Sequence, residues 1–486
     1  MNARLAALLP ALALTACTTV GPDFQPPSVA APGRWDHWHG GDPSLAHTAE
    51  PAPELLRWGQ LADPALQALM RRAEQGNPDV LTAALHLVQA RVHRAQVEAH
   101  GAPQLASALE AARQRQSEHG SATRIANALP AGTRPGMVDA LSAPHSLYQA
   151  GFDAAWELDL WGRVRRALEG ADARVESSGA MLGYARLAVR AEVAREYAAL
   201  RTIQRQRRLL QAQVGVAEDV LHLQQVRIAA GLEDHGATAK QRGMLAQLRA
   251  REPVLLQEEA AAVNRLTLLL GEVPGALQRE LNDAPGDTSW AVRLPVQPGL
   301  PSTLALRRPD IQAALASLHA ATAAIGLAVA DLYPRITLTG SLGLEALSTS
   351  DLASWGARQW RIGPSLSLPL FDGSRRRATV TLRELEQQEA AVRFQRTVLQ
   401  AWHEVDGALS AYNAAKRQHG DARARVEAAG EALELAQHRF RGGLSDELSV
   451  LQARQALAQA EMAESEVLGS AATAWIALAK ALAVQD

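Results

Sequence analysis

Carboxylates at even spacing in one short segment are the residues whose pattern could serve acid–base chemistry. Asp153, Glu157 and Asp159 resemble the carboxylate pairs with which hydrolases cleave glycosidic bonds. In a β-strand, however, side chains at even separations point to the same face. Together with Gln149 they are predicted to form one polar strand face that lines a water-filled lumen. The sequence offers no complete catalytic set, so we expect no enzyme.

Cys17 is the second residue with a chemical role. It is the only cysteine, so no intrachain disulfide can form. Arg4, an apolar stretch over 5–14 and then Leu-Thr-Ala before Cys17 are typical of a secretory signal, and Leu-Thr-Ala-Cys resembles the bacterial lipobox. We expect removal of a signal peptide, 1–16, and an N-acyl and an S-diacylglycerol group on Cys17, with no other cofactor and no metal. Thr18 favours the outer membrane.

Composition and charge narrow the class of protein further. The 486 residues include 49 Lys and Arg against 51 Asp and Glu, a net charge of −2, and 47% are hydrophobic. These values exclude a disordered chain and do not favour a nucleic-acid partner, which would need a basic surplus. No run of 18 or more consecutive apolar residues follows the signal, so a helical membrane protein is not expected. A β-barrel remains open.

The chain repeats itself. Asn77-Pro78-Asp79 is echoed by Arg308-Pro309-Asp310 at an offset of 231, the glycine turn at 162 by that at 373 at an offset of 211, and Arg227 with Gly231 by Arg439 with Gly443 at an offset of 212. Two offsets that differ by about twenty residues indicate a duplicated unit with an insertion in the first copy, which we place in the Gly- and Pro-rich stretch 119–144.

Within each copy the apolar period changes from helical to alternating and back to helical, which predicts helix, β-hairpin and long helices. The domains expected are the signal peptide 1–16, a lipidated extended arm 17–60, a first repeat 61–275 with a hairpin at about 103–160, a linker 276–301, and a second repeat 302–486 with a hairpin at about 334–370.

Four strands per chain are too few for a membrane barrel, since barrels begin at eight, and they would leave exposed edges. Closure by three chains gives twelve strands. The segments 163–230 and 375–441 contain no proline and could each form a helix on the order of 100 Å long. Apolar seams on two faces of the last helix need neighbours on both sides. The fold class expected is therefore mainly α with a membrane β-barrel.

Several motifs, in order, resemble those of the TolC-like outer-membrane efflux channel family, in its lipoprotein, NodT-type branch. They are Cys17-Thr18-Thr19-Val20-Gly21-Pro22-Asp23-Phe24, Trp156-Glu157-Leu158-Asp159-Leu160-Trp161-Gly162-Arg163, Leu306-Arg307-Arg308-Pro309-Asp310, Ala330-Asp331-Leu332-Tyr333-Pro334 and Arg441-Gly442-Gly443-Leu444-Ser445. The resemblance covers the mature chain.

This resemblance implies a homotrimer whose twelve-stranded barrel continues into an α-helical periplasmic tunnel. It also implies a periplasmic adaptor (membrane fusion) protein, an inner-membrane transporter of the resistance-nodulation-division (RND) type and outer-membrane lipid as partners. The family's periplasmic aperture maps onto Leu448, Ser449 and Gln452, with Asp446 and Glu447 nearby. Gln452 stands where a carboxylate is common, and Lys240 is its match in the first copy.

The function expected is that of a passive conduit that exports small toxic compounds from the periplasm to the exterior. A periplasmic structural or adaptor lipoprotein that uses the long helices as a spacer is the alternative from another class. A TolC-like conduit for metal efflux or for type I protein secretion is a further alternative, since substrate choice would lie largely in the pump.

Overall fold

The computed structural model describes residues 19–28, 58, 63–128, 130, 132–232, 234–282 and 307–484. Cys17, most of the arm 17–60 and residues 283–301 of the linker 276–301 lie outside these residues. The helices are α2 (Pro64–Gly76), α3 (Pro78–Ala99), α4 (Arg134–Ser142), α5 (Arg163–Ala229), α6 (His235–Leu269), α7 (Gln278–Asn282), α10 (Pro309–Ala330), α11 (Arg375–Arg441) and α12 (Glu447–Ala481), and the strands are β1 (Gln104–Gln114), β2 (His145–Glu157), β3 (Arg335–Ala346) and β4 (Arg358–Ser367).

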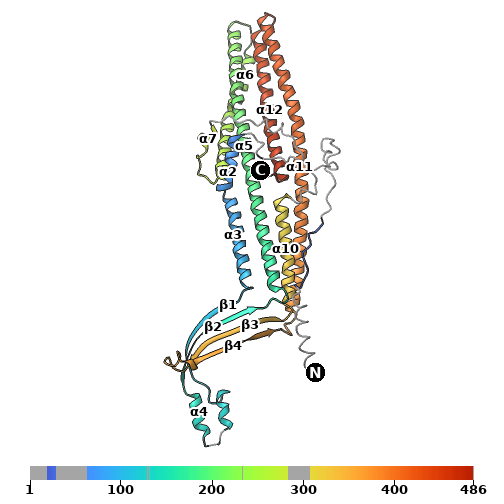
Figure 1. Cartoon of the computed structure of the whole chain (residues 1–486). Coiled ribbons are helices and arrows are strands. Elements are labelled where there is room, and N and C mark those ends of the chain that lie inside the picture. The colour runs from blue at the N-terminus through green and yellow to red at the C-terminus, as the bar shows by residue number, and fades with distance from the viewer. Residues whose placement is uncertain are drawn as a thin grey trace. The chain divides into compact units, whose positions relative to one another are not determined.

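The four strands form one antiparallel sheet in the order β1-β2-β3-β4 (Figure 1). The hairpins β1–β2 and β3–β4 come from the two repeats, and β2 pairs with β3 to join them. Within one chain β1 and β4 are edge strands, each paired on one side only. The 3₁₀ helix η3 (Ala122–Ala128) and α4 lie between β1 and β2, inside the predicted insertion 119–144.

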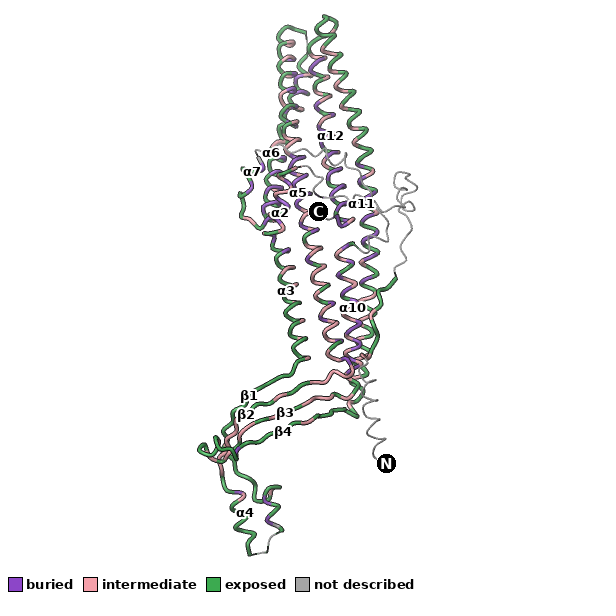
Figure 2. Tube along the Cα trace, in the orientation of Figure 1, coloured by how far each residue is buried: buried purple, intermediate pink, exposed green. Residues whose placement is uncertain are grey.

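The register places polar side chains on one face of the sheet and apolar ones on the other. Asp153 lies opposite Ser341, and Gln149 opposite Glu345. On the other face large apolar side chains are exposed in the single chain, as alternation in a two-sided sheet requires. They are Leu105, Leu109, Phe152, Leu342, Trp360, Ile362 and Leu366, between 55% and 84% exposed. Figure 2 shows most residues of β1 and β4 as exposed.

The helices reproduce the duplication in length. α3 and α10 both have 22 residues, α5 and α11 both 67, and α6 and α12 both 35. Their starts are 212 residues apart, Arg163 to Arg375 and His235 to Glu447, whereas the glycines at 162 and 373 are 211 apart. The extra residue is Ser374, which follows Gly373 with a φ of 66°.

The described part of the chain forms two compact units, and neither is a repeat. One unit takes the described residues within 1–25, 90–175 and 317–390, and so contains the whole sheet. The other takes 26–89, 176–316 and 391–486. Both repeats contribute to each unit, because their strands pair in one sheet and their helices pack together.

The second unit holds a core of helices α2, α5, α6, α11 and α12. Trp58 and Trp475 are fully buried and meet edge to face with ring centroids 6.0 Å apart. The indole N–H of Trp58 donates to the carbonyl of Val484 at 3.0 Å, which satisfies the polar atom of a buried ring.

α10 has the composition of a membrane span, although it contains no run of 18 consecutive apolar residues. Its most apolar window has a mean hydropathy of 1.7, but half of that window is buried inside the protein. Its buried side chains include Ile311, Leu318 and Ile325. The core helix of a soluble protein meets the same criterion, so the composition of α10 is weak evidence for a span.

Candidate functional site

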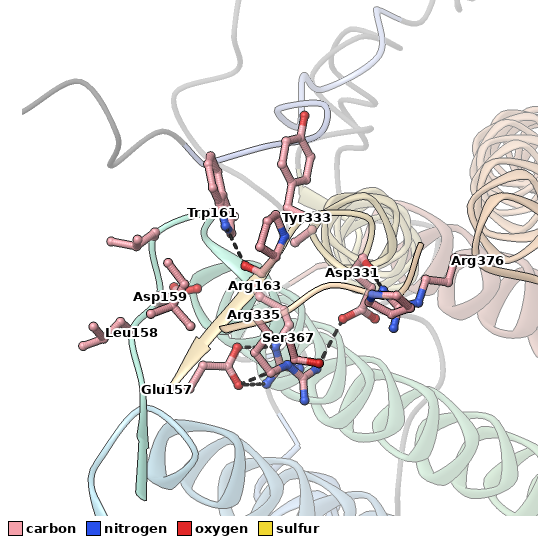
Figure 3. Close-up of a pocket in the computed structure, with 15 residues that line it drawn as sticks. Glu157, Leu158, Asp159, Trp161, Arg163, Asp331, Tyr333, Arg335, Ser367 and Arg376 are labelled. Carbon is pink, nitrogen blue, oxygen red and sulfur yellow. Dashed lines mark hydrogen bonds and ion pairs between the residues drawn. The ribbon is translucent and has the colours of Figure 1, made fainter. Parts of the chain in front are cut away.

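Two of the motifs found in the sequence come together where the strands meet the helices. A cavity of about 160 Å³ is lined by residues 157–161 and Arg163 from the first repeat and by 330–331, 333–336, 367, 369 and 376 from the second (Figure 3). We call this the junction. It gathers the end of β2, the start of α5, the end of α10 and the start of β3 around one polar space.

Charged groups at the junction are paired rather than free. Both carboxylate oxygens of Glu157 accept hydrogen bonds from Arg163, at 2.7 and 2.8 Å, and the side chain of Glu157 is only 17% exposed (Figure 3). Arg335 lies 3.8 Å from the same carboxylate and 3.5 Å from Asp331. A bidentate Arg–carboxylate pair fixes geometry, so Glu157 ties the end of β2 to the start of α5.

The prediction that Asp159 lies on the polar strand face is wrong. β2 ends at Glu157, two residues earlier. The Asp159 carboxylate accepts from the backbone N–H groups of Val164 and Arg165, both at 3.0 Å. It satisfies donors that a helix start leaves without a partner, so its role is to begin α5. Leu158 and Leu160 likewise fall outside the strand.

Aromatic side chains close another side of the junction. The Trp161 indole N–H donates to the carbonyl of Pro334 at 2.9 Å, and its ring stacks on Tyr333 with centroids 4.9 Å apart (Figure 3). Trp161 and the Tyr333-Pro334 pair belong to different repeats. The conformation of both chain turns is therefore fixed by contact between the first and the second repeat of the chain.

The arm around Val20 is held by contacts that sequence reasoning missed. Its N–H donates to the carbonyl of Trp161 at 3.1 Å. The Arg166 side chain is 4% exposed; it donates to the carbonyls of Val20 and Gly21 and pairs with Asp23 at 2.7 Å. A Cβ atom at Gly21, which has a φ of 87°, would overlap the backbone of Gly326. In the sequence, Val20, Gly21 and Asp23 belong to the motif 17–24, but nothing in that motif indicates a contact with Arg166.

On the polar face of the sheet, Gln149 donates to the Glu345 carboxylate at 2.7 Å. Asp153 lies further along the same face, opposite Ala106 and Ser341. Both residues lie within β2 on one face, with Glu345 and Arg361 among the charged neighbours in register. This face can present a hydrated, mixed-charge surface.

The candidate aperture residues lie at the start of α12, in the other unit. Leu448 and Ser449 are partly buried, and Gln452 and Glu447 are exposed. Asp446 is the N-cap: one carboxylate oxygen accepts from the Ser449 N–H at 3.0 Å and from the Ser449 hydroxyl at 2.6 Å, and the other accepts from Arg227 at 2.9 Å.

These contacts change what Asp446 can do. The hydroxyl and N–H of Ser449, with a smaller effect of Arg227, hold the pKa of Asp446 below its ordinary value. Its carboxylate is therefore charged at neutral pH but offset by a cation at 2.9 Å. Of the two acidic residues near Gln452, Glu447 therefore has the negative charge that is less offset by a neighbouring cation.

Replacing Asp446 by alanine is expected to loosen the first turn of α12 by about 1 kcal/mol, the usual loss for an N-cap. Because the folded-state pKa is lowered, the stabilisation is present above the ordinary Asp pKa of about 4 and is lost as pH falls through the lowered value. Hydrogen exchange at the first-turn amides of α12 measures this. Glu447→Ala has the same charge change, and equal protection loss in both variants would contradict the capping role.

No group of three or more His, Cys, Asp or Glu side chains in the described ranges could hold a metal ion. Two of the three carboxylates considered for hydrolysis have structural partners, since Glu157 binds Arg163 and Asp159 caps α5. The geometry supports structure and a polar surface rather than acid–base chemistry.

A family model for outer membrane efflux proteins matches residues 69–272 and 300–484. The chain belongs to this family. Among curated relatives, outer membrane protein OprJ of Pseudomonas aeruginosa is 33% identical over 453 residues, 93% of this chain and 89% of OprJ. Nodulation protein T of Rhizobium leguminosarum is 27% identical over 94% of this chain and 88% of its own.

Among solved structures, the outer-membrane channel OprN matches with a TM-score of 0.80 and 30% identity, over 96% of this chain and 99% of OprN. The resemblance to the TolC-like efflux channels, including their NodT-type members, is confirmed, as are the TolC-like fold and the outer-membrane location. This chain is an outer-membrane efflux channel component. The comparisons support that function over the alternative of a periplasmic spacer lipoprotein.

Proposed function

We propose that three copies of this efflux protein close into a twelve-stranded barrel that continues into a helical tunnel. The observation that carries the proposal is the sheet, in which one face exposes a row of large apolar side chains and the other is polar. Soluble proteins rarely expose so large an apolar patch. Lipid outside and water inside would satisfy both faces, and closure would pair the two edge strands.

The channel is proposed to be a passive conduit without catalytic activity. Its partners are a periplasmic adaptor and an inner-membrane transporter of the RND type, which selects the cargo. Relatives carry names such as toluene efflux pump outer membrane protein TtgI of Pseudomonas putida and pyoverdine export outer membrane protein OpmQ. We infer that small toxic organic compounds are the cargo of this chain.

The mass of the detergent-extracted protein, with its KCl conductance in a planar bilayer, tests this function. We expect particles of three chains that conduct when reconstituted, and a deletion strain that becomes more sensitive to organic toxicants until the intact gene is restored. Monomers that neither bind detergent nor conduct would overturn the proposal. They would favour the alternative function of a periplasmic spacer lipoprotein.

The aperture is proposed to lie at Leu448, Ser449 and Gln452, with Asp446 and Glu447 beside them. In a trimer Gln452 contributes an uncharged ring. Gln452→Glu would add one negative charge per chain and is expected to raise the K⁺ over Cl⁻ permeability ratio about two- to threefold, because a ring of carboxylates concentrates cations. Reversal potentials in a KCl gradient measure it.

Gln437→Glu gives the control for this variant. It adds the same charge on α11, at a position that is not one of the proposed aperture residues. An equal change in permeability ratio in both variants would mean that the effect is general surface charge, and the aperture would then lie elsewhere.

Cys17 is proposed to carry the membrane anchor. Mass spectrometry of the mature N-terminal peptide is expected to show Cys17 as the first residue, with a diacylglycerol and an N-acyl group. Cys17→Ser is expected to leave the signal uncleaved at this position or the chain unacylated, so that less of it is recovered with the outer membrane. A mature terminus elsewhere, without lipid, would contradict the anchor but leave the channel proposal standing.

The lumen is proposed to be lined by Gln149, Asp153 and Glu157 from β2, together with residues at the same register in β3. Glu157 would contribute at the periplasmic end, where its charge is paired with Arg163. Asp159, which caps α5, has no part in this lining.

A further inference from the structure

Each edge strand carries an arginine on the apolar face of the sheet. Arg113 is the last residue but one of β1 and shares a face with Leu109, and Arg358 is the first residue of β4 and shares a face with Ile362. Both arginines are exposed. They lie at the end of the sheet from which the insertion with α4 extends (Figure 1), which we call the outer end. A charge on a face that meets lipid calls for a partner.

Trp355 holds the side chain of Arg358 in place. The Arg358 Nε donates to the carbonyl of Trp355 at 2.6 Å, and its Cζ lies 3.0 Å from the centre of the Trp355 ring. Among the described residues, the two terminal nitrogens of Arg358 have no hydrogen-bond or ion-pair partner, and neither has the guanidinium of Arg113. A guanidinium that is fixed but has unused N–H groups is suited to bind an oxyanion.

The lengths and faces of the edge strands indicate how β4 of one copy meets β1 of the next. Side chains alternate between the faces, so the register can shift only in steps of two residues if apolar is to stay beside apolar. With Ser367 opposite Gln104, the ends of both strands near the helices coincide. Ile362 then falls opposite Leu109 on the apolar face.

Two charges on the polar face select this same register. It places Arg361 opposite Glu110 of the next copy. Both side chains are exposed in the single chain, and within its described ranges neither has an ion pair. A shift of two residues in either direction would place Ala108 or Ala112 opposite Arg361 instead. Opposite charges that face each other across two strands stabilise their pairing, so the register with Arg361 opposite Glu110 is favoured.

The favoured register also brings the two arginines of the outer end together. Arg358 falls directly opposite Arg113 of the next copy, with Cβ atoms about 5 Å apart. Like charges in this position repel each other and weaken the pairing. An anion bound between the two guanidinium groups would remove the repulsion and accept from their unused N–H groups.

We propose that Arg358 of one copy and Arg113 of the next bind the phosphate group of a lipid in the outer leaflet. This rests on the proposed closure of three copies. The place of the two arginines points to a lipid: they lie on the apolar face, and Trp360, 74% exposed, follows Arg358 by two residues on that face, as aromatic residues do at a membrane interface. A phosphorylated lipid would use both the charges and the apolar surface, whereas a free phosphate ion would use only the charges.

Dissociation of the three-chain particle on heating tests the site. The full-length protein in detergent is given lipid A, a phosphorylated glycolipid, or inorganic phosphate at the same phosphate concentration. We expect lipid A to slow dissociation at least about threefold, because a ligand of the assembled state stabilises it, and inorganic phosphate to have little effect. Arg113→Gln and Arg358→Gln should each lose most of the lipid A effect. Without lipid A neither variant should dissociate faster than the unmodified protein, because the substitution removes a repulsion.

Arg124→Gln is the matched control. It removes an equal charge from an exposed residue of η3 in the insertion, outside the strands, and should keep the full effect of lipid A. Equal slowing by lipid A in the control and in both strand variants would overturn the site. Equal slowing of the unmodified protein by inorganic phosphate would overturn the assignment to a lipid.

Disulfide formation between introduced cysteines tests the register on which the site depends. Glu110→Cys with Arg361→Cys is expected to give oxidised species of more than one chain, because within one chain β2 and β3 separate these positions. Ala106→Cys with Arg361→Cys, displaced by four residues, should keep the mobility of a single chain, as should each single-cysteine variant. Linkage of the displaced pair in place of the first would overturn the register.

The outcomes separate this inference from the function it rests on. Three-chain particles that conduct but dissociate at the same rate with and without lipid A would overturn the lipid site while the channel stands. Unmodified protein that never forms particles of three chains would overturn both.

Discussion

Leu342→Arg is expected to prevent assembly of the channel in the outer membrane. Leu342 lies in the middle of β3 on the apolar face, 60% exposed, opposite Phe152 and Trp360. An arginine on the lipid face near the middle of a bilayer costs roughly 2–4 kcal/mol per chain, and a trimer carries three of them. Heat-sensitive trimer recovered from purified outer membranes measures the loss.

Thr339→Arg is the matched control, because Thr339 lies three residues away on the polar face, opposite Ala155 and Gly363, which are uncharged. An arginine there would point into water, and near-normal trimer recovery is expected. Equal recovery of the two variants would show that the apolar face does not meet lipid, and the barrel proposal would fail.

Arg308→Ala is expected to destabilise the helical unit by about 3 kcal/mol. The side chain of Arg308 is 5% exposed and donates to Asp310 through two nitrogens, to Glu404 at 2.7 Å and to the carbonyl of Ala481 at 3.0 Å. It therefore ties the start of α10 to α11 and to the end of α12. Removing one partner of a buried ion pair costs about 3–5 kcal/mol, and the half-exposed Glu404 favours the low end.

Chemical denaturation followed by the fluorescence of tryptophans such as Trp475 measures this loss. Arg307→Ala removes the same charge from the exposed neighbouring residue and should change the free energy of unfolding by less than about 0.5 kcal/mol. Arg308→Lys should fall between, because a lysine cannot donate in the bidentate fashion of arginine. A loss no greater than that of Arg307→Ala would show that the buried contacts carry little stability.

The elements of the fold were accessible from the sequence because they depend on periodicity. Alternation over residues 335–346 predicts β3, and the proline-free runs predict the two 67-residue helices. The boundaries of these elements could not be predicted from the sequence. Alternation continues through Asp159 and Leu160, although the strand ends at Glu157. The chain leaves the sheet there to let Asp159 cap α5, and periodicity contains no signal for that exchange.

The candidate site was predictable only as separate motifs. Trp161 and Pro334 are 173 residues apart, and only the pairing of β2 with β3 brings them within 2.9 Å. The sequence places Asp446 near the aperture residues but does not indicate that its carboxylate faces Arg227 on another helix. Such contacts depend on which helix faces lie together, which a single sequence does not specify.

The hydrogen bond from Val20 to Trp161 has a consequence for where the bilayer surface lies. Only three peptide units separate Val20 from Cys17, a reach of about 10 Å when fully extended. The proposed acyl chains on Cys17 would place the lipid headgroups within that reach of the junction. The proposed anchor would then set the height at which the strands leave the membrane, in addition to tethering the chain.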